Sequence, residues 1–111
     1  MRSDRERLKD IRESIVRIEM HAPKSVDELH SDVVLQGFVI HELQVIGEAV
    51  SRLRLSLKVQ YDDVPWNRIV SMRNAMVHAY HAVDLSIVWN VVNVDVPILK
   101  AAVERMLEEN P

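Results

Sequence analysis

Residues 73–80, RNAMVHAY, place Arg73, Asn74, His78 and Tyr80 within one apolar stretch. A histidine that titrates near neutral pH can take a proton from one group and give it to another. An arginine can bind a phosphate and stabilise the extra charge of a pentacoordinate intermediate. Together these side chains suit RNA cleavage, in which the 2′-hydroxyl loses a proton and the 5′-oxygen gains one.

The spacing of these residues on a helix predicts how they are presented. Asn74 and His78 are four residues apart and share a face, whereas Arg73 lies about 140° around the helix from His78. That face points away from the apolar stripe, which consists of Ile69, Met72, Met76 and Ala79. One helix therefore does not bring Arg73 and His78 together easily. Two copies around a two-fold axis could, which predicts a dimer with a composite site.

Composition favours one helical domain. The chain has 111 residues, 48% hydrophobic and 28% charged, with only two glycines and four prolines. So few turn-forming residues favour a small number of long helices. The absence of cysteine excludes disulfides and thiolate metal sites. A net charge of −3 argues against a protein that coats nucleic acid non-specifically.

The N-terminal sequence MRSDRERLKD is charged from its second residue, which is unlike a signal peptide. We see no apolar run that approaches the ~20 residues of a membrane span. A cytoplasmic protein without a membrane partner is therefore expected.

Capping signals and apolar periodicity define the expected helices. Capping boxes at residues 3–6 and 25–28 begin two of them, and the second is expected to run to about residue 57, with a break near residues 31–32. A third helix should run from about Pro65 to Ala79. Asp84 should cap a fourth, kinked or broken near Pro97. The predicted fold is an all-α, up-down four-helix bundle with residues 1–111 as a single domain.

Two stretches of the expected helices contain residues that disfavour a helix. Gly47 lies inside the long second helix, where glycine costs about 1 kcal/mol relative to alanine; a close approach by another helix would explain it. Residues 88–96 are rich in β-branched side chains and partly alternate like a strand. Their helical spacing, and the lack of a partner strand, favour a helix. Trp66 and Trp89 are expected to be buried anchors between helices.

With RNAMVHAY at its centre, the sequence resembles the HepT-like toxins of the HEPN superfamily. Arg73, His78 and Tyr80 match the family's Arg-x4-His-x-Tyr motif. The resemblance covers nearly the whole chain and is most specific over residues 45–99. The other matching segments are VIGEA at 45–49, VPW at 64–66, MRN at 72–74, VDL at 83–85 with VW at 88–89, and DVP at 95–97.

The resemblance implies a homodimeric, metal-independent endoribonuclease toxin that needs no cofactor and acts on RNA, with tRNA among the candidate substrates. Arg73 and His78 would be catalytic, with Asn74 and Glu48 in support. The partner would be a nucleotidyltransferase-fold antitoxin of the MntA type, which uses ATP to attach AMP to Tyr80. One departure concerns the segment after the motif, where Ala82 replaces the family's usual glycine and alters the loop that presents Tyr80.

Alternative readings remain open. A non-catalytic HEPN module that binds a nucleotide or its partner enzyme would suit the acidic charge balance, and a purely structural bundle would explain the core. His41-Glu42 begins like a zinc-protease motif but has Val45 where the second histidine belongs. His78 and His81 lack an evident third metal ligand. Four basic residues could form a rim for RNA phosphates or a solvated helix face: Arg52, Arg54, Lys58 and Arg68.

Overall fold

The computed structural model describes residues 2–78 and 84–111, and for residues 74–78 it describes the backbone alone. The described residues contain helices and no strand. The long helices are α1 (Asp4–His21), α3 (Val33–Arg52), α5 (Trp66–His78) and a final one made of α6 (Leu85–Asn90), η1 (Val91–Asp95) and α7 (Val96–Glu109). Two short helices, α2 (Val26–Ser31) and α4 (Leu55–Gln60), connect them. This confirms the predicted all-α bundle.

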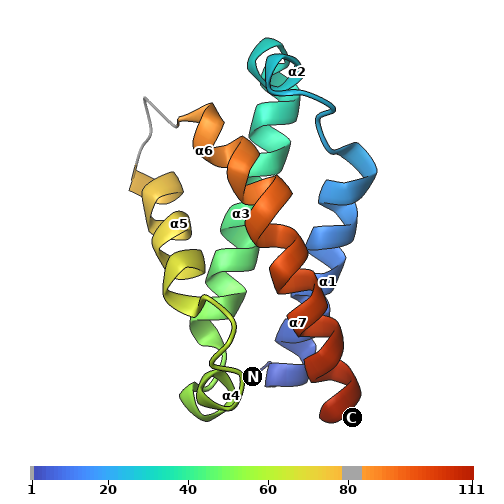
Figure 1. Cartoon of the computed structure of the whole chain (residues 1–111), viewed down its shortest axis with the longest axis vertical. Helices are drawn as coiled ribbons and strands as arrows, with labels where there is room; N and C mark the ends of the chain where they lie inside the picture. The colour runs from blue at the N-terminus through green and yellow to red at the C-terminus, as the bar shows by residue number, and fades with distance from the viewer. Residues whose placement is uncertain (1, 79–83) are drawn as a thin grey trace.

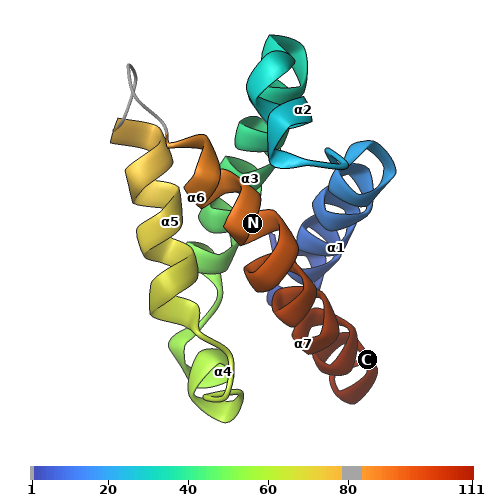
Figure 2. The same ribbon diagram turned by 45° about the horizontal axis from the view of Figure 1, so that its top comes forward.

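The long helices form two layers. Helices α1, α3 and α5 lie side by side with α3 in the middle, and the final helix crosses one face of that layer (Figures 1 and 2). The chain alternates direction from each long helix to the next, while α2 and α4 lie at opposite ends of the bundle. This arrangement matters for function because none of the described helices crosses the other face of the three-helix layer.

The predicted caps begin the helices as expected. The Ser3 side chain accepts from the Glu6 amide and the Glu6 carboxylate accepts from the Ser3 amide, which completes a capping box. Ser25 caps α2 through the Glu28 amide, and the Asp84 carboxylate accepts from the amide of Ser86 at the start of α6. These contacts satisfy amides that have no partner within the helix.

The expected second helix is three helices in the structure. Its break near residues 31–32 is confirmed, because Asp32 is extended and caps α3. The expectation that it continues to about residue 57 is wrong, since α3 ends at Arg52 and the chain is extended at Leu53 and Arg54 before α4. The reason lies in α1: the Arg54 amide donates to the Asp4 carboxylate at 3.3 Å, so it does not donate to the preceding helical turn.

The final helix is continuous from residue 85 to residue 109, and its irregularity near Pro97 is the π-helical segment η1. Proline lacks an amide and its ring collides with the carbonyl four residues earlier. A wider turn just before Pro97 accommodates both defects. Residues 88–96 are thus helical, as their spacing predicted, and the π-helical segment places the buried carboxylate of Asp95 against α5.

Two helical stretches of the described chain, Val33–Arg52 and Leu85–Glu109, are long and apolar enough to cross a membrane by length and composition. The expectation that no such run exists was therefore too strict. In this fold, 33% and 44% of the two apolar windows are buried within the bundle. Core helices of globular proteins pass the same test, so the finding assigns no membrane role.

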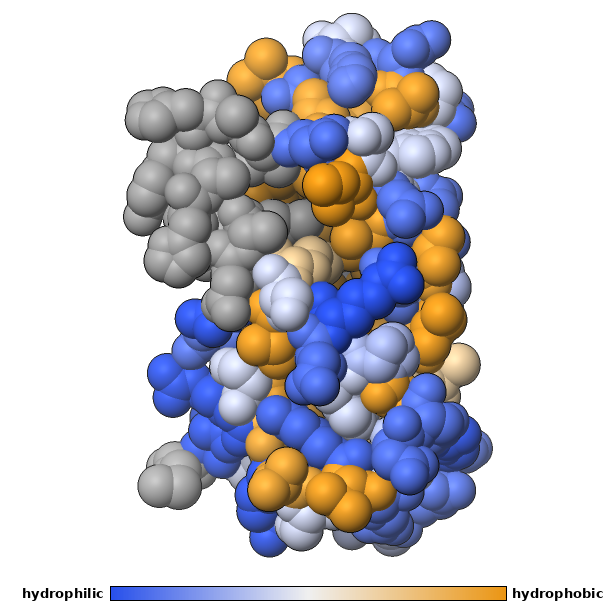
Figure 3. All heavy atoms as spheres, turned by 60° about the vertical axis from the view of Figure 1, so that its left-hand side comes forward, coloured by the Kyte–Doolittle hydropathy of each residue, from blue (hydrophilic) through white to orange (hydrophobic). Residues whose placement is uncertain are grey.

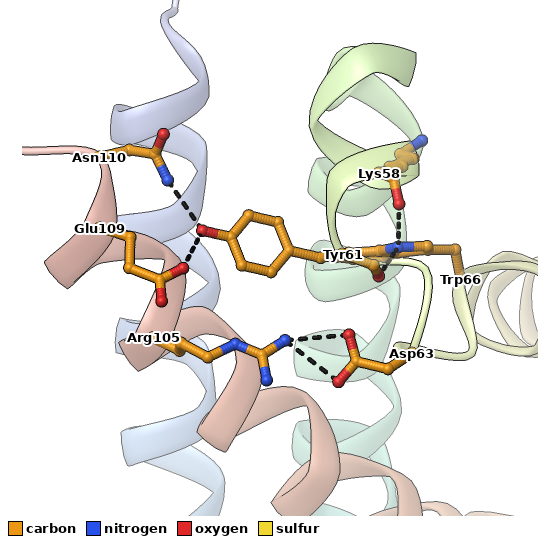
Figure 4. Close-up of polar contacts among 7 residues, drawn as sticks. All are labelled: Lys58, Tyr61, Asp63, Trp66, Arg105, Glu109 and Asn110. Carbon is orange, nitrogen blue, oxygen red and sulfur yellow. Dashed lines mark hydrogen bonds and ion pairs between the residues drawn. The ribbon is translucent and has the colours of Figure 1, made fainter.

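The loop between α4 and α5 is tied to the end of α7 (Figure 4). The buried Tyr61 hydroxyl donates to the Glu109 carboxylate and accepts from the Asn110 amide. The Trp66 indole donates to the carbonyls of Lys58 and Tyr61 at 3.1 and 3.0 Å. Trp66 and Trp89 are half-buried against the core rather than fully buried. These contacts fix the start of α5 relative to α4 and α7, and thereby help to place Arg73 along α3.

Candidate functional site

Arg73 lies directly against Gly47, where α5 and α3 pack closely. A Cβ built onto Gly47 would clash with the Cβ of Arg73 and would lie only 2.7 Å from its Cγ. The predicted close approach is confirmed, and the neighbour is the motif arginine itself. Because Gly47 has no side chain, the stem of Arg73 packs directly against α3 and brings its guanidinium to the neighbouring Glu48.

Glu48 receives that guanidinium. The Arg73 Nη2 lies 2.9 Å from one Glu48 oxygen, and the Arg52 Nε lies 2.7 Å from the other. The hydrogen bond from Arg52, aided by the charges of Arg73 and Arg52, holds the pKa of the Glu48 carboxyl below its usual value. Two guanidinium groups and one ionised carboxylate leave one net positive charge on this cluster. Such a charge can attract a phosphate while the carboxylate orients Arg73.

The cluster forms one wall of a cleft of about 610 Å³. We name it the α1–α3 cleft; its lining includes Arg7 and Arg17 of α1, His41, Val45 and Arg52 of α3, and Arg73. On a helical wheel the cleft residues of α3 lie roughly opposite its buried stripe of Val39, Leu43, Ile46 and Val50. The cleft therefore opens on the face of the three-helix layer that the final helix does not cover.

The predicted site residues are described to different extents. Arg73 and Glu48 lie together in the cleft wall. Asn74 and His78 belong to the last turns of α5, but their side chains lie outside the described part. Tyr80, His81 and Ala82 lie outside the described residues altogether.

The suggested basic rim does not form as one surface. Arg52 lines the α1–α3 cleft, whereas Lys58 and Arg68 line a separate hollow beside α4. Arg54 pairs with Asp4 and Arg68 pairs with Asp95. Arg52 is the one of the four that lines the same cleft as Arg73, so of the two alternatives that the sequence left open, the described residues do not form a single shared rim.

The structure adds Gln44 and Arg17, to which the sequence pattern gave no role, to the lining of the cleft. His41, Gln44, Glu48 and Arg52 follow one another at steps of three and four along the cleft face of α3. That spacing is visible in the sequence and could have identified a polar face. Arg17 could not be found in this way, because it comes from α1. Its guanidinium donates to both oxygens of the buried Glu42 at 3.1 Å.

Among the side chains that the structure describes, those of residues 2–73 and 84–111, no group of three His, Asp or Glu is placed to hold a metal ion together. The cleft is instead dominated by arginines, which bind oxyanions rather than cations.

The fold and cleft define a small helical bundle that presents a motif arginine in an open, polar groove. Residues 11–106 match the family model "Ribonuclease HepT-like". The chain belongs to this HepT-like ribonuclease family. The match runs from the middle of α1 to near the end of α7 and therefore includes part or all of each of the four long helices.

Two relatives illustrate the match. A protein of Thermococcus cleftensis named "Probable ribonuclease HepT" is 33% identical over 106 residues, which are 95% of this chain and 96% of the relative. A protein of Methanocaldococcus jannaschii named as a gamma-glutamylcyclotransferase and putative RNase is 35% identical over 103 residues, which are 92% of this chain. The chain spans about half, 46%, of that longer protein. No solved structure matches the chain significantly.

Proposed function

We propose that this chain is a metal-independent endoribonuclease, the toxin of a toxin–antitoxin pair, and that it works as a homodimer in the cytoplasm. The observation that carries the proposal is Arg73, which crosses Gly47 and places its guanidinium beside Glu48 in an open cleft. Membership of a ribonuclease family and the histidine five residues further along α5 support it.

In the proposed reaction, His78 of one subunit takes the proton from an RNA 2′-hydroxyl. The 2′-oxygen forms a bond to phosphorus and the bond from phosphorus to the 5′-oxygen breaks. The protonated His78 of the second subunit gives a proton to the departing 5′-oxygen. The products are a 2′,3′-cyclic phosphate and a 5′-hydroxyl.

Arg73 would stabilise the added negative charge on the phosphate oxygens. Glu48 would act as a positioning residue, because its carboxylate holds the Arg73 guanidinium at 2.9 Å. Arg52 shares that carboxylate, so Glu48 does not neutralise Arg73 completely. Asn74, one position after Arg73 on α5, is proposed to support the site.

The products test this reaction. RNA cleaved by the protein should carry 2′,3′-cyclic phosphate and 5′-hydroxyl ends, and an RNA with 2′-deoxy sugars at the cut sites should stay intact. A 5′-phosphate end, or equal cleavage of the deoxy substrate, would rule out attack by the 2′-hydroxyl.

We further propose silencing by a nucleotidyltransferase antitoxin of the MntA type, which transfers AMP from ATP to the Tyr80 hydroxyl, with loss of the hydroxyl proton and release of pyrophosphate. The new phosphodiester would carry negative charge close to Arg73 and His78 in sequence and could occupy the phosphate site. Toxin carrying Tyr80→Phe should keep its activity when incubated with antitoxin and ATP. Complete neutralisation of that variant would contradict the mechanism.

A second candidate is a non-catalytic module that binds a nucleotide or the partner enzyme. The net charge of −3 favours it, because most nucleic-acid-binding domains are basic. Cleavage separates the two candidates: unmodified protein that leaves a panel of RNAs intact, tRNA included, would support the binding module.

A further inference from the structure

The α1–α3 cleft is positively charged within an acidic protein. Ten of its twelve described lining residues are polar or charged, and they include five arginines and three carboxylates. With Glu42, which lies outside the lining but binds Arg17, the balance is five arginines to four carboxylates. The whole chain carries a net charge of −3. The excess of arginine is thus local to the cleft that Arg73 enters.

The arginines lie at both ends of the cleft because α1 and α3 run in opposite directions. At one end the Arg7 guanidinium donates to the Arg52 carbonyl at 3.2 Å, which brings α1 to the end of α3. At the other end Arg17 binds Glu42, and its side chain is still 47% exposed. The cleft face of α3 extends from His41 to Arg52, about 16 Å at 1.5 Å per residue. An extended strand of several nucleotides could lie along it.

Between these ends the cleft has an apolar floor. Val45 and Ala49 are one helical turn apart and half-buried, and both line the cleft. A volume of about 610 Å³ lies within the range of small-molecule sites. Single-stranded nucleic acid binds where an apolar surface contacts a flat base and neighbouring cations bind the phosphates.

On the basis of the proposed ribonuclease function, we propose that single-stranded RNA lies in the α1–α3 cleft. A nucleobase next to the cleaved bond rests on Val45 and Ala49, and the adjoining phosphates contact Arg7 and Arg52. Arg73 stands where this path meets the reacting phosphate. A base-paired RNA does not fit, because its bases are stacked within the duplex.

A second copy of the chain is the other possible occupant of the cleft. The centres of protein–protein interfaces are depleted in charged residues. In this cleft charged side chains reach from both walls, and Val45 and Ala49 are the wholly apolar residues of its described lining, with the stems of the arginines adding apolar surface. The charge balance therefore favours RNA.

The test measures RNA binding in a His78→Ala background, so that cleavage does not interfere. The probe is a fluorescent 12-nucleotide single-stranded RNA, and the variants are Ala49→Glu and Arg52→Gln. Arg12→Gln is the matched control, since Arg12 is exposed on α1 and lies outside the cleft. Circular dichroism melting checks folding, and light scattering measures the oligomeric state.

We expect both cleft variants to bind at least about tenfold more weakly, a typical loss for one stacked base or one charged contact. In Arg52→Gln the slope of log affinity against log salt should fall by about 0.7, the value for one phosphate contact on a single strand. Arg12→Gln should bind like its parent, and a duplex of the same sequence should bind more weakly than the single strand. If Ala49→Glu does not fold, Arg52→Gln decides.

Three results would overturn the proposal. If the cleft variants bind like Arg12→Gln while the wild type still cleaves RNA, the ribonuclease proposal stands and the cleft site falls. If Ala49→Glu converts a dimer into a monomer, the cleft is an interface between copies. If the wild type neither binds nor cleaves RNA, both proposals fall.

Discussion

At the scale of single residues, the close contact between Gly47 and Arg73 determines where the motif arginine lies. Alanine at Gly47 would meet the Cβ and Cγ of Arg73, which lie close to the α5 backbone and cannot move without it. Overpacking of this kind costs about 1–3 kcal/mol. It outweighs the gain of about 1 kcal/mol that alanine offers in a helix.

Gly47→Ala should therefore lower the free energy of unfolding in urea. Gly37→Ala is the matched control, because Gly37 is in the same helix and a Cβ there meets nothing within 4 Å. That control should raise the free energy of unfolding by up to about 1 kcal/mol. Two variants that change stability in the same direction would contradict the proposed role of Gly47.

Glu48 provides a pH test of the guanidinium cluster. Its carboxyl pKa is lowered mainly by the hydrogen bond from Arg52, with the charge of Arg73 as a further cause. A lowered folded-state pKa stabilises the protein above the unfolded value near 4.5 and the benefit is lost as the pH falls through the folded value. In an NMR titration, Arg52→Gln should raise the Glu48 midpoint and Arg12→Gln should leave it unchanged. An unchanged Glu48 midpoint in Arg52→Gln would show that Arg52 does not bind the Glu48 carboxylate.

The sequence predicted part of this residue-scale picture. It identified Gly47 as a close-approach position, and it singled out Arg73 and Glu48 as candidates. It did not pair them, because the two residues are 25 positions apart and meet only through the packing of α3 against α5. It gave Gln44 and Arg17 no role, since a lone polar residue on a helix does not show which other helix it will face.

At the scale of elements, the ion pair between Arg68 of α5 and Asp95 of η1 joins the motif helix to the final helix. The Asp95 side chain is 7% exposed and that of Arg68 is 57% exposed. Removing Arg68 leaves a buried carboxylate without its cation, which is costlier than losing a surface pair.

We expect Arg68→Ala to lower the free energy of unfolding by about 1–3 kcal/mol. Adding Asp95→Asn to that variant should recover part of the loss, because the buried charge is then absent. Urea denaturation of the two single variants and the double variant measures the coupling. A double variant that loses the sum of the two single effects would show that the pair does not hold α5.

Helix starts were more predictable than helix ends. Ser3, Ser25 and Asp84 cap their helices through side chains of their own local sequence. The end of α3 at Arg52 depends instead on Asp4. Its carboxylate accepts a hydrogen bond from the Arg54 amide, 50 residues further along the chain. The apolar periodicity of the sequence continues past Arg52, so the helix predicted from it was too long. The π-helical form of the bend before Pro97 also depends on packing rather than on local pattern.

At the scale of the whole molecule, the proposed dimer makes a prediction about mixed subunits. In the proposed reaction one site uses His78 of both subunits, so a dimer with one His78→Ala subunit lacks either its acid or its base. When the wild type is mixed with an equal amount of His78→Ala, random pairing around a two-fold axis leaves about a quarter of the dimers fully wild type. Cleavage should therefore fall to about half of its value before subunit exchange.

The mixing experiment compares RNA cleavage before and after the wild type and His78→Ala exchange subunits, with light scattering to establish the dimer. A fall to about half would support a composite site. Unchanged cleavage, despite demonstrated exchange, would place all catalytic residues of one site in the same subunit. A monomer at micromolar concentration would remove the composite site entirely.

The central claim is most directly tested by RNA cleavage in EDTA, with the wild type beside His78→Ala and with intact masses measured to exclude added AMP. The account predicts that unmodified wild type cleaves RNA under chelation and that His78→Ala does not. Absence of cleavage by the unmodified wild type over a panel that includes tRNA would contradict it. Equal cleavage by both proteins would contradict the role of His78.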